Sequence, residues 1–197
     1  MIAAITDSRL CGGRFAEQMG RIARARPDLI ILREKWLSPE EYRALASEAL
    51  ETCRAAGAEL CANSFSDVAA GLGIRRIQLS VGDLRRLGRG GFDQVIASVH
   101  SAGEAREAED LGADALVFGN VFETACKPGA PARGLAALGE VCGAAGAPVL
   151  AVGGIDEGNM RLAMAAGAAG VCMRGRFMEA EDPAGIVRAY REMRASL

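Results

Sequence analysis

A polar segment follows one of the short apolar runs in the middle of the chain. Residues 118–127 read Phe-Gly-Asn-Val-Phe-Glu-Thr-Ala-Cys-Lys, and the apolar run 114–118 leads into them. Asn120, Thr124 and Lys127 are therefore expected at or just past a strand end, where α/β folds carry their chemistry. Lys127 also opens a Pro/Gly-rich stretch that either closes over a ligand or simply exposes a lysine.

Two basic residues, Arg33 and Lys35, end another apolar run. They are two positions apart, so in an extended chain both side chains point to the same side. Two fixed positive charges suit a phosphate or carboxylate ligand. The alternative is a solvated strand end in which these cations pair with Glu34 or Glu40.

Glycine-rich turns follow the last two apolar runs, as Gly153-Gly154-Ile155 and Arg174-Gly175. In (β/α)8 barrels the loops after the last two strands often hold a phosphate with backbone N–H groups, and glycine lets the anion approach. We therefore expect a phosphate site here. Alternatively, the glycine pair only makes a tight turn before Asp156, which caps the next helix.

His100 is the only histidine of the chain. An imidazole is a general acid or base near neutral pH, so His100 is a candidate catalytic residue. An alternative starts from Ser101 and Glu104, which have the spacing of a helix capping box and would make His100 a junction residue.

A repeated junction indicates the elements that must position these residues. A helical pattern ends in glycine, one small or apolar residue follows, and an apolar strand begins. The pattern occurs at Gly57, Gly73, Gly112, Gly146 and Gly167. Each glycine suits the left-handed residue after a helix, so each junction predicts a helix stop followed by a buried strand.

Eight short strands alternate with helical patterns. The strands are expected over 2–6, 28–33, 59–62, 77–79, 94–98, 115–118, 149–152 and 171–173. The helices are expected over 13–25, 39–56, 65–72, 84–87, 102–111, 135–145, 157–166 and 183–194. Strict alternation predicts parallel strands in a compact, single-domain (β/α)8 TIM barrel over residues 1–197. An open doubly wound sheet is the alternative, but no Gly-x-Gly-x-x-Gly follows the first strand.

Every predicted strand ends in polar or glycine-rich sequence, and Asn63, Gln78 and Ser98 therefore join the candidate binding residues. Acidic residues near strand ends, Asp7, Asp67 and Asp83, show no metal-ligand spacing.

Composition narrows the class of protein. The 197 residues are 50% hydrophobic with a net charge of -2, which gives no basic face for nucleic acid. No signal peptide and no apolar run near about 18 residues is visible, so neither secretion nor a membrane span is expected. The six cysteines form no Cys-x-x-Cys pair and are expected to be reduced in a cytoplasmic protein.

With these positions in view, the whole chain resembles the thiamine-phosphate synthase and TenI-like superfamily. The resemblance rests on residues 4–7, 32–35, 98–101, 118–127, 133–134, 152–155 and 182–183. Within the superfamily, residues 121–124 followed by Cys126-Lys127, and residues 76–79, are more similar to the TenI-like thiazole tautomerase branch.

The synthase branch would imply joining a pyrimidine diphosphate to a thiazole phosphate with Mg2+. Its Asn-Asp pair after the third strand is Asn63-Ser64 here, so Asp83 is the remaining candidate ligand. The family's Thr-Lys pair is likewise changed, to Cys126-Lys127. No cofactor is therefore expected unless the synthase reading holds.

The tautomerase branch would imply moving a proton on a carboxythiazole phosphate, which needs no metal. By position, the resemblance places Gly153, Gly154 and the backbone of Met173 and Arg174 at the phosphate. It places Arg33 and Lys35 near the anionic groups and matches His100 to an active-site histidine.

Two positions depart from the tautomerase pattern. The acid/base histidine of that branch falls on Asn120, and an amide cannot shuttle protons at neutral pH. After the eighth predicted strand, at a position where that branch usually has a small or hydroxyl-bearing residue, this chain has Arg174. Its side chain either adds a charge to the phosphate site or fills it.

The leading expectation is a cytoplasmic, TenI-like isomerase of thiamine biosynthesis that acts on, or binds, a thiazole phosphate. Its alternatives are a divergent thiamine-phosphate synthase and a non-catalytic binder of thiamine intermediates. No nucleic-acid or membrane partner is expected, and apolar helices outside a small barrel are compatible with a homo-oligomer.

Overall fold

The computed structural model describes residues 1–124, 129 and 131–197. Its strands are hydrogen-bonded in sequence order as a closed barrel. They are β1 (Ile2–Ile5), β2 (Leu29–Leu32), β3 (Leu60–Asn63), β4 (Arg76–Ser80), β5 (Gln94–Val99), β6 (Ala115–Gly119), β7 (Val149–Val152) and β8 (Gly170–Met173). The predicted (β/α)8 barrel is confirmed and the open sheet is not found.

Helices follow the strands in the predicted alternation. They are α1 (Phe15–Ala25), α2 (Pro39–Ala56), α3 (Ser66–Gly71), α4 (Val81–Leu87), α5 (Ala102–Asp110), α6 (Gly134–Ala144), α7 (Met160–Ala165) and α9 (Pro183–Ala195). Two short helices, η1 (Ser8–Leu10) and α8 (Gly175–Glu179), were not predicted.

The described residues form two compact units. One comprises Met1, Leu79–Gly90 and Gln94–Met173, and the other comprises Ile2–Gln78, Gly91–Asp93 and Arg174–Leu197. The expectation of one domain over 1–197 stays a prediction.

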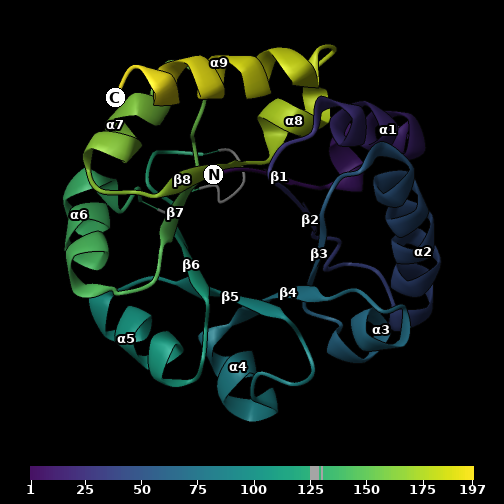
Figure 1. Cartoon of the computed structure of the whole chain (residues 1–197), viewed down its shortest axis with the longest axis horizontal. Coiled ribbons are helices and arrows are strands. Elements are labelled where there is room, and N and C mark those ends of the chain that lie inside the picture. The colour runs from purple at the N-terminus through teal and green to yellow at the C-terminus, as the bar shows by residue number, and fades with distance from the viewer. Residues whose placement is uncertain (125–128, 130) are drawn as a thin grey trace. The chain divides into compact units, whose positions relative to one another are not determined.

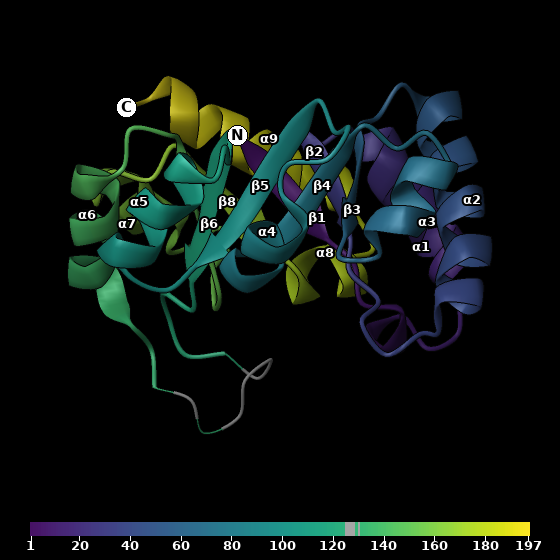
Figure 2. The same cartoon turned by 90° about the horizontal axis from the view of Figure 1, so that it is seen from below.

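The first unit contains β5 to β8 as a parallel set. Ile96 is in register with Ala115, and Leu116 with Val149. β6 is buried along its whole length, so its apolar run forms core while its polar continuation leaves the strand end. Figure 1 shows α5, α6 and α7 along one side of these strands, and Figure 2 shows β5 beside β6.

The second unit contains β1, β2 and β3, which are parallel neighbours, and residues 76–78 of β4. Figure 1 shows α1, α2 and α3 along one side of this set. α2 begins with Pro39 after a capping box, in which Ser38 accepts from the Glu41 N–H and Glu41 accepts from the Ser38 N–H. These caps satisfy backbone donors that the helix itself leaves unpaired.

Glycine junctions behave as predicted at four of the five positions. Gly57, Gly73, Gly112 and Gly167 have φ angles of 65°, 70°, 88° and 102°. The prediction is wrong at Gly146, because α6 ends at Ala144 and its C-cap residue, Ala145, already has extended backbone. There the Glu109 carboxylate accepts from the Ala147 N–H, which gives this segment a partner without a left-handed turn.

The five described cysteines are free thiols, as predicted, and Cys126 lies outside the described residues. Burial raises the pKa of Cys53 and of Cys172 to about 12. Among the residues that the structure covers, no helix is long and apolar enough to cross a membrane.

Candidate functional site

His100 follows β5 and lies against the end of β6. Its Nδ1 is 2.9 Å from the carbonyl oxygen of Gly119. A carbonyl can only accept, so the bond requires the proton on Nδ1 and leaves Nε2 with a lone pair in the neutral ring. In this tautomer of His100, Nε2 is the ring nitrogen that can accept a proton.

Arg133, which directly precedes α6, binds the backbone at the same junction of β5 and β6. Its Nε donates to the Gly119 carbonyl at 3.2 Å, and its Nη1 donates to the His100 carbonyl at 3.1 Å. One guanidinium therefore bonds both residues whose positions fix the imidazole. The sequence drew attention to Arg133 only as part of a family motif.

The helix-capping alternative for His100 is also realised. Ser101 accepts from the Glu104 N–H at 3.1 Å, and Glu104 accepts from the His100 N–H at 2.7 Å. Of these two bonds only the second involves His100, through its backbone N–H, while its ring bonds Gly119. Capping and a catalytic role are therefore not exclusive.

Asn120 is 5% exposed at the end of β6. Its carbonyl accepts from the Arg133 N–H at 2.9 Å, and the Val121 carbonyl accepts from the Gly134 N–H at 3.0 Å. These bonds close the base of the loop. Thr124 lies beyond this closed base, and Lys127 lies outside the described residues.

The glycine pair after β7 is covered by the chain that follows β6. The Val121 N–H donates to the Val152 carbonyl, and the Phe122 N–H donates to the Gly153 carbonyl. A Cβ on Gly153 would lie 2.5 Å from the Asn120 Cβ, and one on Gly154 would overlap the Glu123 carbonyl oxygen. Close backbone packing thus requires both glycines, a reason that the sequence did not reveal.

The remaining predicted positions of this unit lie at strand ends. Ser98 is half-buried in β5, in register with Val117. Met173 is buried at the end of β8. Phosphate binding by Gly153, Gly154 and Met173 stays a prediction.

In the second unit, Glu34 is buried between the loops after β1 and β2. It accepts from Thr6 Oγ1 at 2.6 Å and from the Ser8 N–H at 3.0 Å, and the Arg33 N–H donates to Thr6 Oγ1 at 3.0 Å. Of the predicted cations beside it, Arg33 is half-buried and Lys35 is exposed. Glu34 therefore ties two loops together.

Asp7 is 1% exposed and binds two arginines. Arg9 donates to both of its oxygens at 3.0 Å, and Arg174 Nη1 lies 2.9 Å from Oδ2. Burial alone would raise the pKa of Asp7, but the hydrogen bond from Arg9 and the charges of Arg174 and Arg9 outweigh it and lower that pKa.

The positive charge of Arg174 is therefore paired with the Asp7 carboxylate. Its Nε is buried without a hydrogen-bond partner in the described part of the chain.

Asn63 and Gln78 form a buried amide pair. Asn63 Nδ2 donates to Gln78 Oε1 at 3.1 Å. The Asn63 N–H donates to the hydroxyl of Tyr42, which donates to the Leu32 carbonyl, and burial raises the pKa of Tyr42. Neutral hydrogen bonds therefore position the two predicted amides.

The residues do not fit a magnesium site of the kind that the synthase resemblance implies. Asp83 accepts from Ser80 Oγ at 2.7 Å and from Arg86 at 3.1 Å, so both carboxylate oxygens already have partners. Ser64 supplies a hydroxyl where a second carboxylate would be needed. Among the described residues, no three acidic, histidine or cysteine side chains are grouped as metal ligands.

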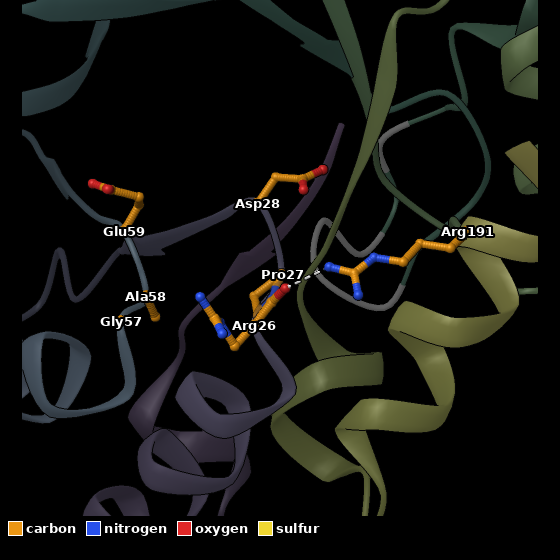
Figure 3. Close-up of a pocket in the computed structure, with 7 residues that line it drawn as sticks. All are labelled: Arg26, Pro27, Asp28, Gly57, Ala58, Glu59 and Arg191. Atoms are coloured by element: carbon orange, nitrogen blue, oxygen red, sulfur yellow. Dashed lines mark hydrogen bonds between the residues drawn. The ribbon is translucent and has the colours of Figure 1, made fainter.

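A pocket of about 410 Å³ lies before β2 and β3 (Figure 3). It is lined by Arg26, Pro27, Asp28, Gly57, Ala58, Glu59 and Arg191. Asp28 accepts from the Ile2 N–H at 2.8 Å, and Arg191 donates to the Arg26 carbonyl at 3.1 Å. This is the amino-terminal end of the strands, where barrel residues serve stability.

The fold is a (β/α)8 barrel in which polar side chains follow the strands of each unit. A family model described as thiamine monophosphate synthase matches residues 2–177. The chain therefore belongs to the thiamine monophosphate synthase family.

Individual relatives agree with this membership. A thiamine-phosphate synthase of Methanoculleus marisnigri is 34% identical, over 95% of this chain and 92% of the relative. A thiamine biosynthesis bifunctional protein of Symbiobacterium thermophilum is 38% identical over 82% of this chain, which spans 35% of that relative. The solved thiamine phosphate pyrophosphorylase of Pyrococcus furiosus has a TM-score of 0.84 at 26% identity, covering 99% of this chain and 95% of that one.

Proposed function

We propose that this family member acts in thiamine biosynthesis as an isomerase that moves a proton on a carboxythiazole phosphate, with His100 as the acid/base residue. The observation that carries the proposal is the bond from His100 Nδ1 to the Gly119 carbonyl. It orients the ring and leaves Nε2 as the proton acceptor.

The reaction needs one proton to leave and one to return. Nε2 takes the proton from the ring carbon that bears the carboxylate, and the electron pair moves toward the exocyclic carbon. The imidazolium then returns a proton to the exocyclic carbon, which aromatises the ring. Asn120 cannot relay a proton as an amide, so His100 serves both steps.

Substrate anions are assigned to groups at the strand ends. The phosphate is assigned to backbone N–H groups of Gly153, Gly154 and Met173, because backbone donors favour anions. Arg174 contributes less than an unpaired arginine, since Asp7 already binds its guanidinium. The remaining substrate contacts are assigned to Arg33, Lys35, Asn63, Gln78, Ser98, Thr124 and Lys127.

A synthase reaction is the second candidate, and the names of the relatives favour it. It would need Mg2+ at a diphosphate. Asp83 bonded to Arg86 and a serine at position 64 argue against that metal site. A non-catalytic binder is the third candidate, favoured by Asn120.

Two assays on one purified protein separate the candidates. The isomerase reading predicts that the protein speeds the ultraviolet change of aromatisation in the presence of EDTA. It also predicts no diphosphate release from the pyrimidine diphosphate and thiazole phosphate at high Mg2+. Diphosphate release without isomerisation would instead establish the synthase, and thermal stabilisation by thiazole phosphate without turnover would establish the binder.

A further inference from the structure

A cation–aromatic pair lies after the first two strands of the second unit. The guanidinium carbon of Arg9 is 3.7 Å from the centroid of the Trp36 ring. Arg9 belongs to η1, which follows β1, and Trp36 belongs to the loop after β2. Both residues therefore lie at the carboxyl ends of strands, where (β/α)8 barrels bind ligands.

Two hydrogen bonds to Asp7 fix the orientation of the Arg9 guanidinium plane. Its Nε and Nη2 each donate at 3.0 Å to a different oxygen of Asp7. Such a two-point bond sets the orientation of the fork as well as its position. Asp7 itself is buried and is held by Arg174, so the cation is attached to a rigid base.

Trp36 is held by the turn on which it lies. The Leu37 N–H donates to the Glu34 carbonyl at 3.1 Å. The Glu34 carboxylate is bonded to Thr6 and Ser8 of the neighbouring loop. The loops that carry Arg9 and Trp36 are thus tied together, and little ordering is left for a ligand to impose.

The stack is open on its outer side. The Arg9 side chain is 60% exposed although one face of its guanidinium lies on the indole, so the opposite face is in contact with solvent. A guanidinium is planar, and each of its two faces can stack on an aromatic ring. An aromatic ring placed there would extend the stack by one layer.

We infer that the open face of Arg9, backed by Trp36, is a stacking site for a planar heteroaromatic ring. A ring bearing a carboxylate is the preferred class, because its negative charge meets a fixed cation. Asp7 already accepts from the Arg9 Nε and Nη2 groups and so offsets part of the Arg9 charge, which makes planarity contribute more than charge. This inference does not depend on the isomerase reaction at His100.

Trp36 is the only tryptophan of the chain, so its fluorescence reports on the stack directly. The probe is thiazole-2-carboxylate, and the control is cyclopentanecarboxylate, which has the same charge on a saturated ring. The inference predicts a saturable change of Trp36 emission with the thiazole and none with the control at the same concentration. Equal responses to both, or no response to the thiazole, would overturn it.

Variants test the contribution of each layer by calorimetry with the same probe. Arg9→Met and Trp36→Ala should each weaken binding about five-fold or more, as expected for loss of a cation–aromatic contact. Arg75→Met is the matched control, because Arg75 is 62% exposed and is held by Asp93 but lies before β4. Unchanged affinity in Arg9→Met, or equal weakening in Arg75→Met, would contradict the stacking site.

Discussion

His100 Nδ1 and the Gly119 carbonyl oxygen, 2.9 Å apart, join the ends of β5 and β6. The bond selects the tautomer whose Nε2 is unprotonated in the neutral ring. It also spans 19 residues of sequence, so the parallel pairing of the two strands is what creates it. The pairing of β5 with β6 and the bonds from Arg133 thus position the proposed base.

Arg133→Gln should lower kcat about ten-fold or more with little change in KM, because misplacing a catalytic group slows the chemical step. The guanidinium bonds the carbonyls of both Gly119 and His100, and glutamine cannot bridge them. Steady-state kinetics of aromatisation measure both constants.

Arg106→Gln is the control for Arg133→Gln, because Arg106 is an exposed arginine on α5. It should leave both constants unchanged. A rise in KM at constant kcat in Arg133→Gln would show that Arg133 binds substrate instead of positioning His100.

Asn120→His should raise kcat about ten-fold or more if a second imidazole shares the proton transfer, since acid/base groups contribute 10²–10⁴-fold. The larger ring must fit a position that is 5% exposed and packed against Gly153. A stability cost of about 1–3 kcal/mol is therefore expected, and thermal unfolding measures it. A folded variant with unchanged kcat would show that this position takes no part in proton transfer.

Gly154→Ala should destabilise the fold by about 2 kcal/mol or more, because the residue has φ +64° and its new Cβ would overlap the Glu123 carbonyl. Gly143→Ala is the matched control. Gly143 lies in α6 and a Cβ there meets nothing within 4 Å, so alanine should be neutral or stabilising. Urea unfolding compares the two, and equal stability of both variants would remove the packing argument.

Asp7→Asn should lower the free energy of unfolding at pH 7 by about 1–3 kcal/mol, the contribution of a charged hydrogen bond. The pKa of Asp7 is lowered in the folded state. Its stabilisation is therefore present above the unfolded pKa of about 4 and is lost as the pH falls through the folded pKa.

Measuring the free energy of unfolding at a series of pH values tests the direction of this pH dependence. The difference between the native protein and Asp7→Asn should shrink below about pH 4. Asp182→Asn removes an exposed carboxyl paired with Arg188 and should change much less. A difference that is constant from pH 7 to pH 3 would exclude the ion pair as its cause.

The fold could be predicted because its signals are local. Strand and helix alternation and the glycines at positions 57, 73, 112 and 167 depend on short stretches of sequence. At Gly146, where the prediction is wrong, the Ala147 N–H donates to the carboxylate of Glu109, 38 positions earlier in the chain. Where a helix end is bonded by a side chain that is distant in sequence, the local sequence at the junction does not indicate it.

The site could be predicted only in part, for the same reason. His100 and the amide residues could be chosen as candidates because they follow apolar runs, and their roles stay predictions. Asp7 and Arg174 meet across the sequence, and Arg133 reaches back to His100, so no spacing indicates either contact. Glu34 entered the sequence analysis only as an alternative partner for Arg33 and Lys35, and the fold buries it on Thr6 and Ser8.

The proposed reaction is tested most directly by comparing the native protein with His100→Gln on carboxythiazole phosphate under metal-free conditions. We predict that the native protein accelerates aromatisation and that His100→Gln reduces kcat by about 10²-fold or more while still binding the substrate. Aromatisation at the native rate in a folded His100→Gln variant would contradict the account.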